Sequence, residues 1–328
     1  MKGTEEYNLL METKAKKIIN DNEDKPYLEG FYYYALSNMS YASAYNYLFY
    51  AHKFIENANV KNLRDITMDT YTKYMYTVKG YTSSYRIAIY SSLKKFSKYL
   101  KANGYCEDYM QYVPRPKFFE TQQTKDRREK GYLTKTEAKT MLSSVPNINS
   151  IRSRNATWIA RDKAIILLFL NTGIRCAALY KLDIDDLDLT EKTIKVFEKG
   201  EKARSVDIND ITAMALTEWI VLRNLYMEEN GADNKETALF ISQRKERFGT
   251  QGIARTIREC SKTIGGKKIT PHKLRATYGT QLYNKTHDIY FVQDCMGHAS
   301  PLTTEKYIRG NKGNATKKAS DLMSDFIN

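Results

Sequence analysis

Scarce titratable side chains crowd one stretch near the carboxyl end of the chain, residues 270–307. Three of the protein's four histidines lie in it. His272 and Arg275 are three residues apart, a spacing that places both on one face of a helix. His298 follows a glycine, and Tyr307 comes nine residues after it. The polar ends of these four side chains could therefore converge on one small anion.

Phosphoryl transfer is the chemistry that uses arginine, histidine and tyrosine together. Cationic donors stabilise charge on the non-bridging oxygens, and a hydroxyl group can act as the nucleophile. Any one of these residues alone is equally well explained as an exposed helix residue or a core aromatic, since the chain has 26 tyrosines. The pattern as a whole carries the interpretation.

Helix signals indicate the elements that would position these residues. Pro271 suits the first position of a helix. Gly297 ends a second, apolar helix over residues 289–296, and a turn at Pro301 begins a third short helix that would carry Tyr307. Three helix ends are therefore predicted to meet around the anion.

His-x-x-Arg, Gly-His and a tyrosine nine residues later resemble the tyrosine recombinases, the phage-integrase group of site-specific DNA recombinases. That family also carries an arginine in an upstream Thr-Gly-Leu-Arg-like motif and a lysine in a following β-hairpin. This chain has Thr-Gly-Ile-Arg and, 24 residues after its arginine, Lys-Gly-Glu-Lys. The resemblance implies six catalytic residues: Arg175, Lys199, His272, Arg275, His298 and Tyr307.

The resemblance also implies what each residue does. Tyr307 attacks the scissile phosphate, giving a 3′-phosphotyrosyl link and a free 5′-hydroxyl, so bond energy is conserved and neither ATP nor another cofactor is needed. Arg175 and Arg275 each offer a planar fork of donors to the non-bridging oxygens. Lys199 protonates the leaving 5′-oxygen, with Lys202 as the local alternative.

The histidines and one departure complete this assignment. The resemblance gives His272 the task of assisting proton removal from the nucleophile and His298 that of hydrogen-bonding the phosphate. Ala178 stands where the family usually has an acidic residue that helps to order the active site. Asp183 and Asp185 are alternative sources of that support.

The composition favours a polyanionic partner. Net charge is +14 and the pI is near 9.3, although a merely soluble basic protein has the same balance. Four scattered cysteines lack metal-binding spacing, so neither a zinc site nor a disulfide framework is predicted. There is no 18-residue apolar run and no secretion signal. We expect a cytoplasmic, nucleoid-associated protein.

Residues 27–105 predict four helices, with starts at Ser40, Thr67 and Thr82 and a stop at Asn103. The resemblance places a helical core-binding domain here. Basic side chains of this part of the chain and of the linker are candidate phosphate contacts, with a solvated helix face and a plain linker as alternatives. These candidates are Lys94, Lys95, Lys98, Lys101, Lys125, Arg127 and Arg128.

The second half predicts helices and a small sheet. A capping box of Thr134 and Glu137 begins a helix, and residues 158–171 form a buried helix ended by Gly173. Strands are predicted over residues 183–189, 193–197 and 203–208, then helices over 211–229 and 251–264. The fold class is mainly α with a small antiparallel β-sheet, a helical bundle followed by a mixed α/β catalytic domain.

The predicted division has five parts: an amino-terminal arm or extra helix (1–24), a helical core-DNA-binding domain (25–110), a linker (111–131), a catalytic domain (132–310) and a tail helix (311–328). The tail carries an apolar face that could dock on its own domain or on a neighbouring protomer.

The resemblance implies a recombinase that integrates or excises a mobile element. It would act on double-stranded DNA with specific recombination sites, as a homotetramer on DNA and a monomer when free, with accessory DNA-bending or directionality factors left open. The alternatives are a type IB topoisomerase-like enzyme and a catalytically silent DNA-binding protein.

Overall fold

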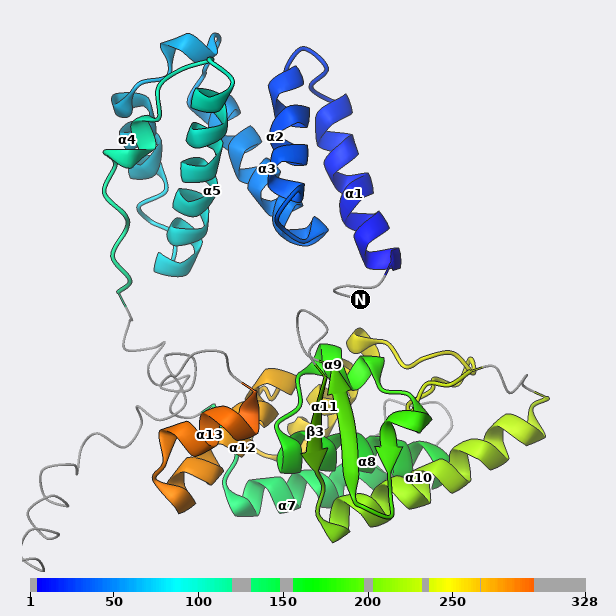
Figure 1. Ribbon diagram of the computed structural model, residues 1–328. Helices are drawn as coiled ribbons and strands as arrows, with labels where there is room; N and C mark the ends of the chain where they lie inside the picture. The colour runs from blue at the N-terminus through cyan, green and yellow to red at the C-terminus, as the bar shows by residue number, and fades with distance from the viewer. Residues whose placement is uncertain are drawn as a thin grey trace, which may run out of the picture. The chain divides into compact units, whose positions relative to one another are not determined.

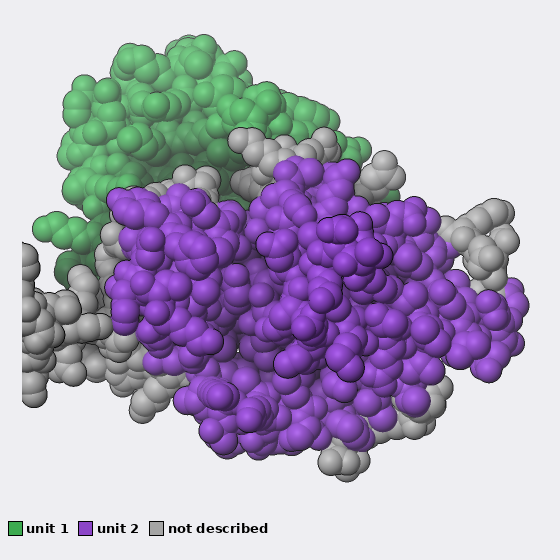
Figure 2. All heavy atoms as spheres, turned by 60° about the horizontal axis from the view of Figure 1, so that its bottom comes forward, with its two compact units in different colours: residues 1–122 green, residues 123–328 purple. Residues whose placement is uncertain are grey.

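The computed structural model describes residues 5–119, 131–147, 156–197, 203–231, 236–265 and 267–297. The chain divides into two compact units, residues 1–122 and 123–328 (Figure 1), and Figure 2 colours them in its space-filling view. The prediction of a mainly helical chain with a small antiparallel sheet is confirmed. In the described residues no helix is long and apolar enough to cross a membrane.

The first unit is built from helices that begin where side-chain caps stand. Ser40, Thr67 and Thr82 each accept a backbone N–H from the first turn of a helix, as the sequence predicts. The described helices of this unit are α1 (Glu5–Asn20), α2 (Pro26–Leu36), α3 (Tyr41–Asn57), α4 (Met68–Thr77) and α5 (Ser83–Ala102), with short 3-10 turns at Leu63–Asp65 and Tyr109–Gln111.

Aromatic side chains fill the core of the first unit. Phe54 stacks on Tyr71 with ring centroids 4.7 Å apart. Phe31 and Phe96 pack edge to face, with ring centroids 4.9 Å apart. Helix α1 packs against α3, and its Ala15 is fully buried. Residues 5–20 thus form a helix seated on the bundle.

The second unit is organised around one buried helix, α8 (Ala156–Thr172), which packs against α10 and α12 (Figure 1). The other described helices are α7 (Lys135–Ser144), α9 (Cys176–Lys181), α10 (Asp210–Glu229), α11 (Thr250–Cys260), α12 (Pro271–Thr286) and α13 (Ile289–Met296). The capping box of Thr134 and Glu137 forms as predicted.

The sheet has three antiparallel strands in the order β1–β2–β3. Strands β2 (Thr193–Phe197) and β3 (Ala203–Asp207) match the prediction closely and pair from Thr193 with Asp207 to Phe197 with Ala203. The prediction of a strand over residues 183–189 is wrong for most of its length, since within this range only β1 (Leu187–Asp188) is a strand.

The missing part of that strand is a 3-10 turn, Ile184–Asp186. The Asp186 carboxylate accepts the Asp183 N–H at 3.0 Å, and aspartate side chains that bond nearby backbone groups favour turns over extended chain. A smaller difference concerns the helix predicted over 251–264, in which α11 ends at Cys260 and a 3-10 turn, Ser261–Thr263, follows.

Candidate active site

The end of α8 places the first arginine. Gly173 has φ +58°, the left-handed conformation that ends many helices, and its N–H donates to the Phe169 carbonyl at 3.1 Å. A Cβ at this position would lie 2.4 Å from Cδ1 of Tyr278, so only glycine fits. The chain turns away here, and Arg175 becomes the residue that precedes the first turn of α9.

Helix α12 carries His272 and Arg275 as predicted. The Thr270 side chain accepts the Lys273 N–H, and Pro271 occupies the first turn. His272 is exposed on that turn, whereas Arg275, one turn later, is only 3% exposed. The Arg275 guanidinium donates through Nη1 to the Gly173 carbonyl and through Nη2 to the Met296 carbonyl at 2.5 Å.

Helix α13 ends at Met296, the residue whose carbonyl Arg275 binds. Gly297 has φ +61°, and its N–H donates to the carbonyls of Asp294 and Gln293. The next three carbonyls accept hydrogen bonds from arginines. Nη1 of Arg204 donates to the Cys295 carbonyl at 3.3 Å, Nη2 of Arg275 donates to the Met296 carbonyl, and Nη2 of Arg175 donates to the Gly297 carbonyl at 3.1 Å. The last carbonyls of a helix lack partners within the helix and carry its negative dipole end, which attracts cations.

Three arginines from three different segments therefore hold the last residues before His298. Arg175 comes from the turn after α8, Arg204 from β3 and Arg275 from α12. Sequence reasoning pairs the first and the last of these and misses Arg204. Alternation along β3 was the available signal, because it places Arg204 on the same face of the strand as the buried Val206.

Burial sets the ionisation of the groups around Arg204. Burial lowers the pKa of Arg204, while Tyr278 and Cys295 raise it. Burial is also the main reason that the pKa of Tyr278 rises to about 12, with Cys295 adding to the shift. The Tyr278 hydroxyl therefore stays neutral at physiological pH, beside a guanidinium that remains charged because arginine titrates far above neutrality.

The structure describes three of the six predicted catalytic residues. It brings Arg175 and Arg275 together and sets His272 one helical turn before Arg275. Lys199, its alternative Lys202, His298 and Tyr307 lie outside the described residues.

Ala178 is buried in α9, where its methyl group packs in the core of the second unit. Asp183 and Asp185, the alternative sources of a carboxylate, have other surroundings. Asp183 accepts Nη2 of Arg247 at 2.5 Å and Oγ1 of Thr237 at 2.9 Å, and Asp185 is exposed on the 3-10 turn. The Asp183 carboxylate is therefore committed to a structural ion pair.

The α5 lysines that are candidate phosphate contacts differ from one another. Lys94 and Lys98 are exposed. Lys95 is half-buried, donates to Oδ1 of Asn38 at 2.8 Å and lies 5.4 Å from the centre of the Tyr34 ring. Lys101 pairs with Glu107 at 2.8 Å. Lys95 and Lys101 therefore already have partners within the first unit.

The linker candidates Lys125, Arg127 and Arg128 lie outside the described residues. Within α5, Lys95 is bonded to Asn38 and Lys101 to Glu107. The exposed Lys94 and Lys98 are therefore the stronger candidates for phosphate contacts on this helix.

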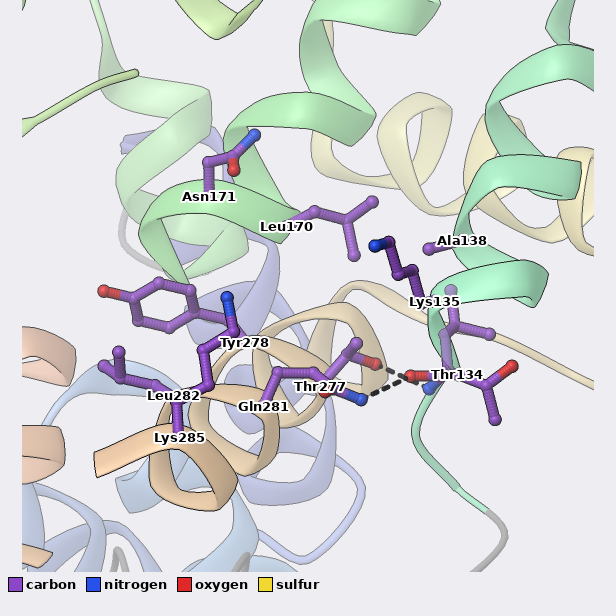
Figure 3. A pocket seen from close by; sticks show the side chains of 11 residues that line it. Thr134, Lys135, Ala138, Leu170, Asn171, Thr277, Tyr278, Gln281, Leu282 and Lys285 are labelled. Atoms are coloured by element: carbon purple, nitrogen blue, oxygen red, sulfur yellow. Dashed lines mark hydrogen bonds between the residues drawn. The ribbon is translucent and has the colours of Figure 1, made fainter. Parts of the chain in front are cut away.

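A cavity of about 410 Å³ lies between α7, α8 and α12 (Figure 3). Thr277 and Gln281 of α12 hydrogen-bond the backbone of Leu133 at 2.9 and 3.1 Å, which joins the residues just before α7 to α12. Arg175, His272 and Arg275 are not among the residues that line the cavity. It is therefore separate from the arginine cluster.

Comparisons with known proteins point to one family. The model of the phage integrase family matches residues 131–314. Tyrosine recombinase XerC of Thermodesulfovibrio yellowstonii is 36% identical over 156 residues, which cover 47% of this chain and 52% of that protein. The chain spans about half the length of the curated relatives it matches.

Solved structures share the fold. XerH site-specific recombinase, bound to a palindromic difH substrate after cleavage, is 22% identical with a TM-score of 0.68 and covers 86% of this chain and 80% of its own. A lambda integrase tetramer bound to a Holliday junction is 17% identical with a TM-score of 0.62, covering 86% and 76%.

Proposed function

We propose that this chain, which belongs to the phage integrase family, is a site-specific DNA recombinase that cleaves and rejoins strands through a phosphotyrosine intermediate. The observation that carries the proposal is the meeting of Arg175 and Arg275 at the Met296 and Gly297 carbonyls, directly before His298. Two guanidinium groups that meet at neighbouring carbonyls form a site suited to a phosphodiester.

The proposed reaction exchanges one phosphodiester for another. Tyr307 attacks the scissile phosphorus, and the bond to the 5′-oxygen breaks while a 3′-phosphotyrosyl bond forms. Lys199 gives its proton to the leaving 5′-oxygen, and His272, exposed on the first turn of α12, assists removal of the tyrosine proton. Arg175 and Arg275 neutralise the non-bridging oxygens. The reverse attack by a 5′-hydroxyl rejoins the strand without an external energy source.

The proposed partner is double-stranded DNA carrying specific recombination sites, bound by a homotetramer that forms from monomers on the DNA. The basic balance of the chain, +14, supports a DNA partner. The XerH structure contains a difH substrate, and the lambda integrase structure is a tetramer on a Holliday junction. Accessory DNA-bending or directionality factors would add to this core, in the cytoplasm at the nucleoid.

The biological reaction that we propose is integration or excision of a mobile element. Recombination between plasmid-borne copies of the element's ends and its target would test it. Reaction of identical paired sites alone, with no activity on element ends, would instead indicate a resolution reaction.

Covalent trapping tests the chemistry directly. Wild-type, Tyr307→Phe and Tyr290→Phe proteins are incubated with nicked duplexes that carry the recombination site, and SDS-resistant, protease-sensitive adducts are measured. Adducts are expected with wild type and with Tyr290→Phe, whose tyrosine is 68% exposed on α13, and their loss is expected with Tyr307→Phe because the nucleophile is gone.

Other outcomes separate the rival functions. Specific DNA binding without any adduct would favour a silent DNA-binding protein, and Ala178→Glu would then be the first variant to try. Adducts together with relaxation of supercoiled plasmids that lack paired sites would favour a topoisomerase-like enzyme.

A further inference from the structure

Helix α13 is short, and its carboxyl end carries the segment that leads to His298. Its eight residues pack mainly on α12 (Figure 1). A helix of this length has little intrinsic stability, so the position of its last turn depends on bonds from outside. Those bonds come from Arg175, Arg204 and Arg275. Two of the three belong to the proposed phosphate site, and Arg204 does not.

Arg204 reaches α13 from a paired β-strand. It lies in β3, opposite Val196 in the register of β2 and β3, so its backbone is fixed by the strand pairing. Its side chain leaves the strand on the face of Val206, which is 9% exposed. A guanidinium held this way can donate at a defined angle, because its donors lie in one plane.

The contact of Arg204 is to Cys295, one residue before the carbonyl that Arg275 binds. Nη1 of Arg204 donates to the Cys295 carbonyl at 3.3 Å, and Tyr278 hydrogen-bonds the Cys295 side chain. Cys295 is therefore held from β3 and from α12 at once. The strand that supplies Arg204 also follows directly on the segment that contains Lys199.

We infer that Arg204 is a positioning residue that fixes the last turn of α13 against the sheet and thereby directs the backbone that leads into His298. The inference rests on the proposed function of the same site. Arg204 acts through a backbone carbonyl and does not itself neutralise the phosphate.

The test measures single-turnover adduct formation on nicked DNA at saturating protein, with DNA affinity and melting temperature measured in parallel. Arg204→Ala and Arg204→Gln are compared with Ser205→Ala, which lies on the exposed face of the same strand. Misplacement of a reacting group by about 1 Å can slow a reaction about a hundred-fold, so we expect Arg204→Ala to slow adduct formation about ten- to a hundred-fold with unchanged DNA affinity. Ser205→Ala should match wild type.

A double-mutant cycle with His298→Ala distinguishes positioning from a general structural role. If Arg204 acts through His298, the double variant is no slower than His298→Ala alone, because the position it controls is already lost. Losses that multiply would overturn the inference. Should Arg204→Ala not fold, Arg204→Gln, which keeps an N–H donor, carries the same cycle.

The proposed function and this inference fail in different ways. Absence of Tyr307 adducts with wild-type protein would remove the proposed function. Adducts with wild type, formed at the same rate by both Arg204 variants, would overturn the role of Arg204 alone.

Discussion

The two arginines of the candidate site differ in how much of the structure depends on them. Arg275 is buried and donates to two backbone carbonyls, those of Gly173 and Met296, in residues that are themselves buried. Arg175 is partly exposed and donates to the Gly297 carbonyl. Arg275 thus joins α12 to the ends of two other helices, α8 and α13.

Arg275→Ala should therefore lose stability as well as activity. Each buried carbonyl left without its donor costs about 1–3 kcal/mol, whereas Arg175→Ala should slow adduct formation by at least ~10² with a smaller loss in the free energy of unfolding. Urea denaturation and single-turnover trapping measure the two effects, with Arg258→Ala, an exposed arginine of α11, as the control. Equal losses of stability at Arg175 and Arg275 would contradict this division.

At the scale of elements, the site depends on where α8 stops. Gly173 allows the left-handed turn, and Tyr278 of α12 packs directly over it. The Gly173 carbonyl also accepts a hydrogen bond from Arg275. The end of α8 therefore sets the directions of both the Arg175 backbone and the α12 packing.

Gly173→Ala and Gly231→Ala form a matched pair, since both glycines have φ +58° and no atom lies within 4 Å of a Cβ added at Gly231. Each alanine should lower the free energy of unfolding by about 1–2 kcal/mol, because an L-residue is strained in the left-handed conformation. Only Gly173→Ala also displaces the Tyr278 ring, so it should lower the free energy of unfolding further and slow adduct formation. Indistinguishable urea midpoints for the two variants would argue against a role for the close Tyr278 contact.

At the scale of the whole molecule, a net charge of +14 supports the proposed DNA partner. Electrostatic binding to phosphates releases counterions and makes affinity fall steeply with salt. In the first unit, Lys94 and Lys98 are exposed, whereas Lys95 is bonded to Asn38 and Lys101 pairs with Glu107.

Lys94→Ala and Lys98→Ala should each reduce the slope of log affinity against log salt by about 0.9, the value for one phosphate contact. Lys95→Ala serves as the comparison and should leave the slope unchanged, because its ammonium group is held by Asn38. Binding titrations over a range of salt concentrations give these slopes. Unchanged slopes for Lys94 and Lys98 would mean that this flank is a solvated helix face.

The sequence by itself determined the features that depend on neighbours a few residues away. Caps at Ser40, Thr67 and Thr134 start helices, and Gly173 and Gly297 end them, because each bond involved closes within about four residues. The bounds of α13 and the common face of His272 and Arg275 follow from such local signals.

Only the tertiary structure decided which distant groups meet. The bond from Arg204 to the Cys295 carbonyl, the contact of Lys95 with the Tyr34 ring and the ion pair of Asp183 with Arg247 all join residues more than fifty positions apart. Strand pairing and helix packing place these groups, and a buried charge or carbonyl takes whichever partner that packing brings within reach. Alternation along β3 places Arg204 on the buried face of the strand, but local periodicity does not say which group its guanidinium meets, and only the packing of the second unit brings it to the Cys295 carbonyl.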